Sequence, residues 1–152
     1  MSNSLYDRDF YAWANEQAAL LRAGRLAEAD LENIAEEIES MGRSEKRELN
    51  SRLRVLLMHL LKWRHQPTLR SKSWSNTIAA QRDDIVDHLA DNPSLKDKLP
   101  EVLTSAYRKA ILDAAAETGI DSSTFPSTCP WTYDQIMDAA FWPEETAQEA
   151  LA

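Results

Sequence analysis

A helical apolar pattern that keeps its phase from Leu31 to Trp63 constrains this chain more than any other feature. Such spacing puts side chains on one face of a helix. Because the phase is kept across Gly42, we predict one long central helix over about residues 30–66. A break near Gly42 with a new cap at Ser44 is the alternative. The apolar positions follow steps of three and four residues, through Glu45, and are Leu31, Ile34, Ile38, Met41, Leu49, Leu53, Leu56, Leu60 and Trp63.

The rest of the chain also has helical periodicity, and no strand-like alternation with turn dipeptides is present. Helices are expected over about residues 9–23, 74–90 and 100–118, with a short one after Thr132. The residues expected to cap them are Asp7 or Asp9, Ser73 and Thr132, the last in a capping box with Gln135. Gly24 and Gly119 follow helical segments, where glycine adopts the left-handed conformation that ends a helix. The predicted fold class is all-α, a helical bundle around the long central helix.

The C-terminal part interleaves prolines with large apolar rings, in Phe125-Pro126, Cys129-Pro130-Trp131 and Phe141-Trp142-Pro143. Exposing so much aromatic surface is costly, so we expect this segment to dock on the bundle. A length of 152 residues fits one domain. We predict a single helical domain over residues 5–143, with frayed termini at residues 1–4 and 144–152.

Composition excludes several classes of protein. Hydrophobic residues at 43% indicate a chain that buries a core rather than a disordered one. The only three glycines are far apart, so no loop can cradle a nucleotide phosphate. No apolar run approaches a membrane span, and the N-terminus does not resemble a signal peptide. With Cys129 as the single cysteine, a cytoplasmic location without disulfides is expected.

His59 lies in the densest apolar run and is the first candidate for a metal ligand. However, the residues three positions before the three histidines are Leu56, Lys62 and Ile85, none of which binds metal. His59 and His65 diverge by about 240° around a helix, so one helix cannot present both to one ion. A site that combines His59 with a carboxylate such as Glu37, and with His88 from another helix, is the one metal site left open. No catalytic motif, cofactor or metal is therefore predicted, and His59 is only a weak candidate ligand.

Polar residues on or beside apolar stripes are the better lead to a site, because buried polar groups need partners. Either they hydrogen-bond to one another, or they enclose a ligand. In the second case His59 would act as a general base or single metal ligand with Glu37 as its partner, and Trp63 would form a wall. The candidate pocket comprises Gln17, Asn33, Glu37, His59, Trp63, Gln81 and Arg82.

Charge is unevenly distributed along the central segment. Acidic residues crowd positions 28–39, whereas basic residues dominate positions 43–72. Two solvated helix faces of opposite sign, packed near one another, are the simpler interpretation. The alternative is a basic strip that binds nucleic acid, which the net charge of −8 disfavours.

Many short motifs, in order, resemble a bacterial family called domain of unknown function 29. They are Tyr6-Asp7-x-Asp9-Phe10-Tyr11-Ala12-Trp13, residues 30–39, His59-Leu60-Leu61-Lys62-Trp63, Gln66-Pro67, Arg70-Ser71-x-Ser73-Trp74, Thr77-Ile78, Gln81-Arg82 and the three proline-aromatic pieces near the C-terminus. Trp131 stands where a tyrosine is equally expected. The resemblance covers about residues 5–143 and implies an all-α, single-domain cytoplasmic protein. It implies no activity.

Three hypotheses for function remain. The absence of catalytic motifs, together with amphipathic helices that serve as partner surfaces, favours a non-enzymatic module that binds a protein partner or a second copy of itself. The first alternative is an enzyme or a ligand- or metal-binding protein that uses the polar pocket around His59 and Glu37. The second is a nucleic-acid-associated protein that uses the basic segment 43–72.

Overall fold

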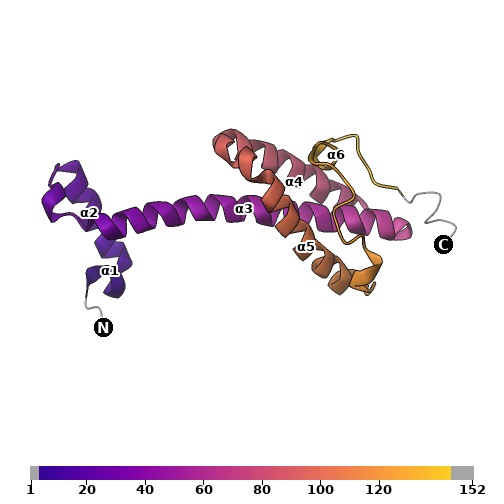
Figure 1. Cartoon of the computed structure of the whole chain (residues 1–152), viewed down its shortest axis with the longest axis horizontal. Helices are drawn as coiled ribbons and strands as arrows, with labels where there is room; N and C mark the ends of the chain where they lie inside the picture. The colour runs from indigo at the N-terminus through magenta and orange to yellow at the C-terminus, as the bar shows by residue number, and fades with distance from the viewer. Residues whose placement is uncertain (1–3, 145–152) are drawn as a thin grey trace. The chain divides into compact units, whose positions relative to one another are not determined.

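The computed structural model describes residues 4–144 and confirms the all-α class, since no strand occurs within them (Figure 1). The α-helices are α1 (Leu5–Arg8), α2 (Phe10–Arg22), α3 (Leu31–His65), α4 (Lys72–Asp91), α5 (Leu99–Thr118) and α6 (Tyr133–Met137). Short 3-10 turns join several of them, namely η1 (Leu26–Glu28), η2 (Pro67–Leu69), η3 (Pro93–Lys98) and η4 (Ser122–Thr124). None of the helices in this range has both the length and the apolar character needed to cross a membrane.

The predicted fraying falls mostly on residues 1–3 and 145–152, which lie outside the described part of the chain. At its edges, the Ser4 hydroxyl donates to Asp7 at 3.0 Å, and Glu144 accepts from Arg70 at 3.1 Å.

The long central helix is confirmed, because α3 runs for 35 residues without interruption. Gly42 does not have a positive φ, so the alternative of a break at this residue is not found. Gly24 and Gly119 do adopt positive φ, at 71° and 75°, and end α2 and α5 as predicted. Gly42 therefore lies inside α3 with an ordinary helical backbone conformation.

Two predicted caps are confirmed and one is wrong. The Asp9 side chain accepts from the Ala12 amide, and Thr132 forms the expected capping box with Gln135. The cap of α4 is Ser71 and not Ser73. Ser71 has the extended backbone that a cap requires and accepts from the Trp74 amide at 3.2 Å, whereas Ser73 already lies in the first turn.

The chain forms two compact units that meet between Ser44 and Glu45, inside α3. Each is described by itself, and the single domain over residues 5–143 stays a prediction. The first unit contains α1, α2 and the first part of α3. Its apolar interior is small and consists of Trp13, which is 5% exposed, with the rings of Tyr6 and Phe10 against it.

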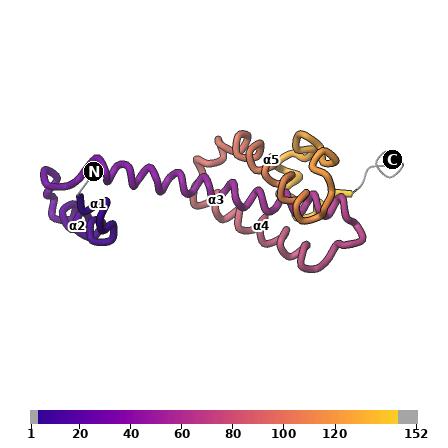
Figure 2. Tube along the Cα trace, turned by 90° about the horizontal axis from the view of Figure 1, so that it is seen from below, coloured from indigo at the N-terminus to yellow at the C-terminus, as the bar shows by residue number. Residues whose placement is uncertain are grey.

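The second unit holds the main core, formed by the rest of α3 with α4, α5 and the C-terminal segment (Figure 2). Three contacts pair α3 with α4 in reverse order: Glu48 with His88, Arg52 with Asp84, and Lys62 with Trp74. The two helices are therefore antiparallel. α5 runs in the same direction as α3, since its partners occur in the same order: Lys46 with Glu101, Arg54 with Asp113, and Lys62 with Glu117.

The predicted docking of the C-terminal segment is confirmed. Phe125 is buried in the core, and Trp142 lies against Trp63 with ring centroids 4.6 Å apart. The segment is also held by hydrogen bonds, because the Tyr107 hydroxyl donates to the Pro126 carbonyl at 2.6 Å.

Candidate functional site

The polar candidates of the first unit meet at Asp30, the residue that precedes α3. The Asn33 amide donates to the Asp30 carboxylate at 2.7 Å, and the Trp13 indole donates to the same oxygen at 3.2 Å. The Asp30 backbone amide donates to Gln17, which is 8% exposed, at 2.7 Å. Hydrogen bonds from Asn33 and Trp13 hold the pKa of Asp30 below its usual value. These groups satisfy one another and fix the start of α3 against α2.

Glu37, one helical turn further along α3, accepts a hydrogen bond from the Tyr6 hydroxyl. This bond, together with the negative charge of the carboxylate, raises the pKa of Tyr6 to about 12. Sequence reasoning named Gln17, Asn33 and Glu37 but missed Asp30 and Tyr6. Asp30 was visible as an N-cap residue ahead of the helix, three positions before Asn33.

His59, the leading candidate from the sequence, lies half-buried on α3 in the second unit. Its Nδ1 is 2.9 Å from the carbonyl oxygen of Val55 on the same helix. Burial lowers the pKa of His59, and the nearby Lys62 charge acts in the same direction. Both effects favour the neutral form of the ring. Among residues 4–144, two groups of side chains are close enough to share a cation, and neither includes His59.

Trp63 and Gln81 each hold a buried polar atom that has no hydrogen-bond partner within the described chain, Nε1 of the indole and Oε1 of the amide. Such atoms typically cost about 1–3 kcal/mol each. Trp63 is otherwise well packed, between the ring of Trp142 and the guanidinium of Arg70, which lies 5.0 Å from its ring centroid. The two predicted site residues that hold a buried polar atom without a hydrogen bond, Trp63 and Gln81, therefore both lie in the second unit.

Arg82 is the most unusual of the predicted residues because it is a charged side chain only 5% exposed. Its Nε donates to the Ile136 carbonyl at 2.7 Å and its Nη2 to the Phe141 carbonyl at 2.8 Å. The guanidinium also lies 5.4 Å from the ring centroid of Trp142. Arg82 therefore ties the chain on both sides of residues 138–140 to α4.

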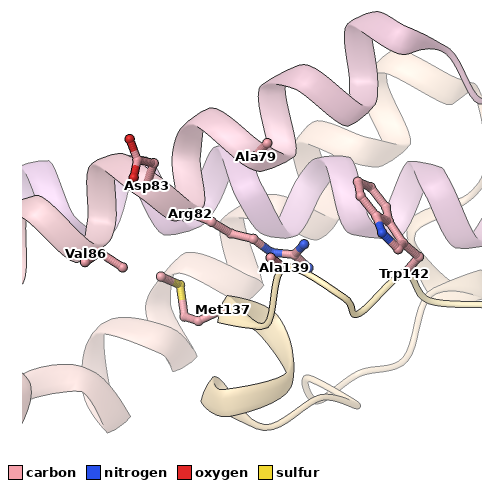
Figure 3. Close-up of a pocket in the computed structure, with 7 residues that line it drawn as sticks. All are labelled: Ala79, Arg82, Asp83, Val86, Met137, Ala139 and Trp142. Atoms are coloured by element: carbon pink, nitrogen blue, oxygen red, sulfur yellow. The ribbon is translucent and has the colours of Figure 1, made fainter.

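A pocket of about 260 Å³ opens beside Arg82, between α4 and the C-terminal segment (Figure 3). Its lining is mostly apolar and includes Ala79, Val86, Met137, Ala139 and Trp142, with Arg82 and Asp83 as the charged groups. Of the seven residues predicted to form one site, three lie in the polar cluster of the first unit and four lie in the second. Within the second unit, Trp142 joins Trp63 to Arg82.

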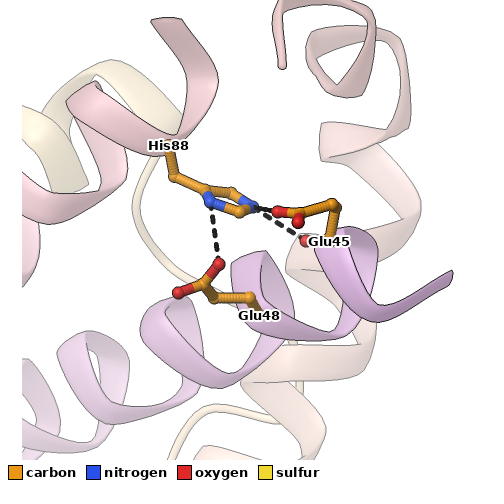
Figure 4. A group of neighbouring side chains, drawn as sticks. All are labelled: Glu45, Glu48 and His88. Atoms are coloured by element: carbon orange, nitrogen blue, oxygen red, sulfur yellow. Dashed lines mark hydrogen bonds and ion pairs between the residues drawn. The ribbon is translucent and has the colours of Figure 1, made fainter. Parts of the chain in front are cut away.

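His88 forms a second polar cluster, with Glu45 and Glu48 of α3 (Figure 4). Its ring is 8% exposed, with Nδ1 3.0 Å from the Glu48 carboxylate and Nε2 2.8 Å from the Glu45 carbonyl oxygen. The Glu45 carboxylate is 3.6 Å from Nε2. Because the two carboxylates approach different ring nitrogens, the cluster as it stands cross-links α3 and α4 rather than presenting one nitrogen and two oxygens to one ion.

Sequence reasoning missed this cluster because it tested carboxylates three residues before each histidine, and the one site it considered between helices joined His88 to His59 and Glu37. The carboxylates belong instead to the antiparallel neighbour of α4. The available signal was the pair Glu45 and Glu48, spaced three apart where the apolar stripe of α3 resumes at Leu49.

Much of the basic segment 43–72 is engaged with carboxylates. Arg54 forms a bidentate pair with Asp113, and Lys62, 9% exposed, lies 2.7 Å from Glu117. Further ion pairs involve Arg43, Lys46, Arg52 and Arg70. The carboxylates belong mostly to α4, α5 and residue 144, and only Arg43 pairs with the acidic positions 28–39, through Glu36 and Glu39 of its own helix. Packing of the two oppositely charged segments against one another is therefore not found among these ion pairs, and nucleic-acid binding stays a prediction.

An apolar row on α3 is the other candidate surface. Leu31, Ile38 and Met41 are 52%, 62% and 66% exposed, although they continue the stripe that is fully buried from Leu49 to Leu60. At 100° per residue, Leu31, Ile38 and Leu49 lie within about 20° of one another around the helix axis. The same face of one helix is thus covered in the second unit and bare in the first. We call Leu31, Ile34, Ile38 and Met41 the α3 row.

These features define an all-α protein with a docked C-terminal segment and an exposed amphipathic helix face. The family model described as Domain of unknown function DUF29 matches residues 5–142, and the chain belongs to this family. No curated protein and no solved structure matches the chain. The family assignment agrees with the resemblance read from the sequence motifs and brings no activity with it.

Proposed function

We propose that this protein is a non-enzymatic interaction module that self-associates through the α3 row. The observation that carries the proposal is the exposure of Leu31, Ile38 and Met41, each more than half exposed at helical spacing. Contiguous exposed apolar patches of this kind mark interaction surfaces, and an amphipathic helix face is a common form of them. A cytoplasmic location, expected from the sequence, is part of the same proposal.

The small interior of the first unit supports a partner at this surface. Among its described residues, only Trp13 and Gln17 are buried. Units of this size rarely gain enough from a core of their own without oligomerisation or another constraint. Phe10, Tyr11, Leu21 and Leu26 add exposed apolar surface, at 40–80% of their full area. A partner that covers the α3 row supplies the missing burial.

A second copy of this chain is the partner that the α3 row favours, because the row is apolar and presents no charge that would repel an identical face. The charged residues nearby do not oppose this pairing. At 100° per residue, Glu32 and Arg43 lie about 140° and about 160° from the centre of the row, on the far side of α3. Arg43 pairs there with Glu36 and Glu39 of its own helix.

The strength of the pairing follows from the exposed side chains. Burying an exposed Leu, Ile or Met contributes about 1.5–3 kcal/mol, so covering three residues about 60% exposed on each of two copies contributes roughly 5–11 kcal/mol. Association itself costs about 4–15 kcal/mol. The balance predicts a reversible, concentration-dependent dimer with a Kd in the micromolar range or weaker.

Sedimentation velocity over a concentration series tests the proposal. Wild-type protein is expected to shift from monomer to dimer, and Ile38→Glu is expected to raise the Kd at least tenfold by placing a charge in the interface. Leu112→Glu is the matched control, because Leu112 on α5 is 61% exposed and lies outside the α3 row. A strict monomer at all concentrations, or an equal effect of both variants, would refute the proposal.

A further inference from the structure

The charge of Arg82 is not neutralised by an ion pair within the described chain. Lys62, the comparable buried cation on α3, lies 2.7 Å from Glu117, but no carboxylate lies within 4.0 Å of the Arg82 nitrogens in residues 4–144. Burial lowers the pKa of Arg82, and the charge of Asp138 opposes this only in part. A guanidinium remains protonated in such surroundings, so the site holds a positive charge that two backbone carbonyls only partly offset.

The hydrogen bonds of Arg82 leave one amino group unused. Nε and Nη2 donate to Ile136 and Phe141, whereas Nη1 makes no hydrogen bond within the described residues. A guanidinium carries five N–H donors in a fixed fork, and the two bonds account for two of them. The two carbonyls fix the plane of the fork. A donor held in this way is suited to a carboxylate, which accepts such bonds strongly.

The size and lining of the neighbouring pocket limit which molecules can bind beside Arg82. Its volume of about 260 Å³ lies just below the roughly 300–1,000 Å³ that is typical of small-molecule pockets. Trp142, Met137 and Val86 give it an apolar wall, as Figure 3 shows. A molecule that fills it therefore combines a small apolar or aromatic body with one polar group.

The acidic groups around the pocket favour a ligand with a small negative charge over one with a large negative charge. Asp83 lines the pocket and is grouped on α4 with Asp84 and Asp87. Asp138, the residue after α6, is close enough to Arg82 for its charge to raise the pKa of the guanidinium. These carboxylates repel a multiply charged anion such as phosphate more than a monoanion.

We infer that the pocket between α4 and the C-terminal segment binds a small organic monocarboxylate, with its carboxylate on Arg82 and its apolar body against Trp142 and Met137. The site uses a different part of the molecule from the α3 row and does not depend on self-association. The contacts of Arg82 with Ile136 and Phe141 stay in place when the ligand binds, so no rearrangement of the segment is required.

Phenylacetate is a suitable probe because it carries one carboxylate on a small aromatic body. Binding is measured by NMR titration, following the indole signal of Trp142, which is assigned with Trp142→Phe. Saturable shifts with a Kd of about 1 mM are expected for a ligand of this size. Phenylacetamide, the neutral analogue, is expected to bind at least tenfold more weakly, and inorganic phosphate is expected to give no saturable shift.

Two variants separate the site from non-specific binding. Val86→Phe fills the pocket without removing a hydrogen bond of Arg82, and it is expected to weaken phenylacetate binding at least tenfold. Leu112→Phe adds the same side chain at an exposed position of α5 and is expected to leave the Kd unchanged. Equal binding of phenylacetate and phenylacetamide, tighter binding of phosphate, or an unchanged Kd in Val86→Phe overturns the inference.

Arg82→Lys tests the guanidinium itself. Lysine keeps the charge but not the planar fork, so phenylacetate binding is expected to weaken at least fivefold. A binding loss counts for the inference only if the far-UV circular dichroism of the variant matches that of the wild type. If Arg82→Lys unfolds the C-terminal segment, the Val86→Phe and phenylacetamide results still decide the outcome.

Discussion

Gly42→Ala is expected to stabilise α3 locally, because neither the backbone conformation nor the space around residue 42 requires a glycine. Its backbone is helical, it is exposed, and a Cβ built on it meets nothing within 4 Å. Glycine in a helix interior costs about 0.5–1 kcal/mol relative to alanine, mainly through backbone entropy. The substitution is therefore expected to raise the free energy of opening of α3 around residue 42 by that amount.

Hydrogen-exchange mass spectrometry measures this change directly. Peptides that cover residues 36–48 are expected to show protection factors about two- to fivefold higher in Gly42→Ala. The comparison belongs at a concentration where light scattering gives a monomer, because residue 42 lies on the same side of α3 as Ile38. Ala35→Gly, an exposed site seven residues earlier, supplies the reverse control and is expected to lower protection by a similar factor.

Gly119→Ala is the matched contrast. Its φ of 75° is in the left-handed region, where a Cβ costs about 1–2 kcal/mol, so this variant is expected to destabilise the end of α5. If Gly42→Ala lowers protection as Gly119→Ala does, then residue 42 adopts a non-helical conformation in solution. That result would refute the continuity of α3.

Three further outcomes are expected. Leu56→Ala is expected to lower the free energy of unfolding by about 2–5 kcal/mol in urea titrations, because Leu56 is fully buried, whereas Leu112→Ala is expected to change it by less than about 0.5 kcal/mol. Burial raises the pKa of Cys129, so its thiol is expected to react with a disulfide reagent at pH 7 more slowly than free cysteine, and a faster reaction would contradict its packed position. The hydrogen bond from Arg54 lowers the pKa of Asp113 below its unfolded value, so the stability it contributes is present above about pH 4 and is lost as the pH falls through the folded pKa. Asp113→Asn is therefore expected to flatten the acid limb of a stability–pH profile, and an unchanged profile would show that the pair is not formed.

The elements of this fold were readable from the sequence because local chemistry specifies them. The phase of the apolar stripe predicted α3 through Gly42, and glycine C-caps and the Thr132 box predicted helix ends that the structure confirms. The error at Ser73 has a local origin as well. Two serines two residues apart both suit an N-cap, and only the backbone that enters α4 decides in favour of Ser71.

The candidate site was less predictable because it depends on which helices meet. A helical wheel places Gln81 and Arg82 on α4 but does not identify the carbonyls of Ile136 and Phe141 that bind Arg82. Backbone acceptors in a non-helical segment leave no pattern in a sequence. In the same way, the partners of His88 come from a neighbouring helix, and no spacing within α4 points to them.

The length of α3 nevertheless leads to an expectation that the periodicity of its apolar residues does not give by itself, namely that part of the apolar stripe is exposed. Its 35 residues make it about three times as long as the average helix of a globular protein. One core cannot cover an apolar stripe along such a helix. The covered part begins at Leu49, where the stripe is fully buried, and the α3 row is what remains. A continuous phase across Gly42 thus implies both a long helix and an exposed apolar face, and the cost of exposing that face is the physical reason to expect a second copy there.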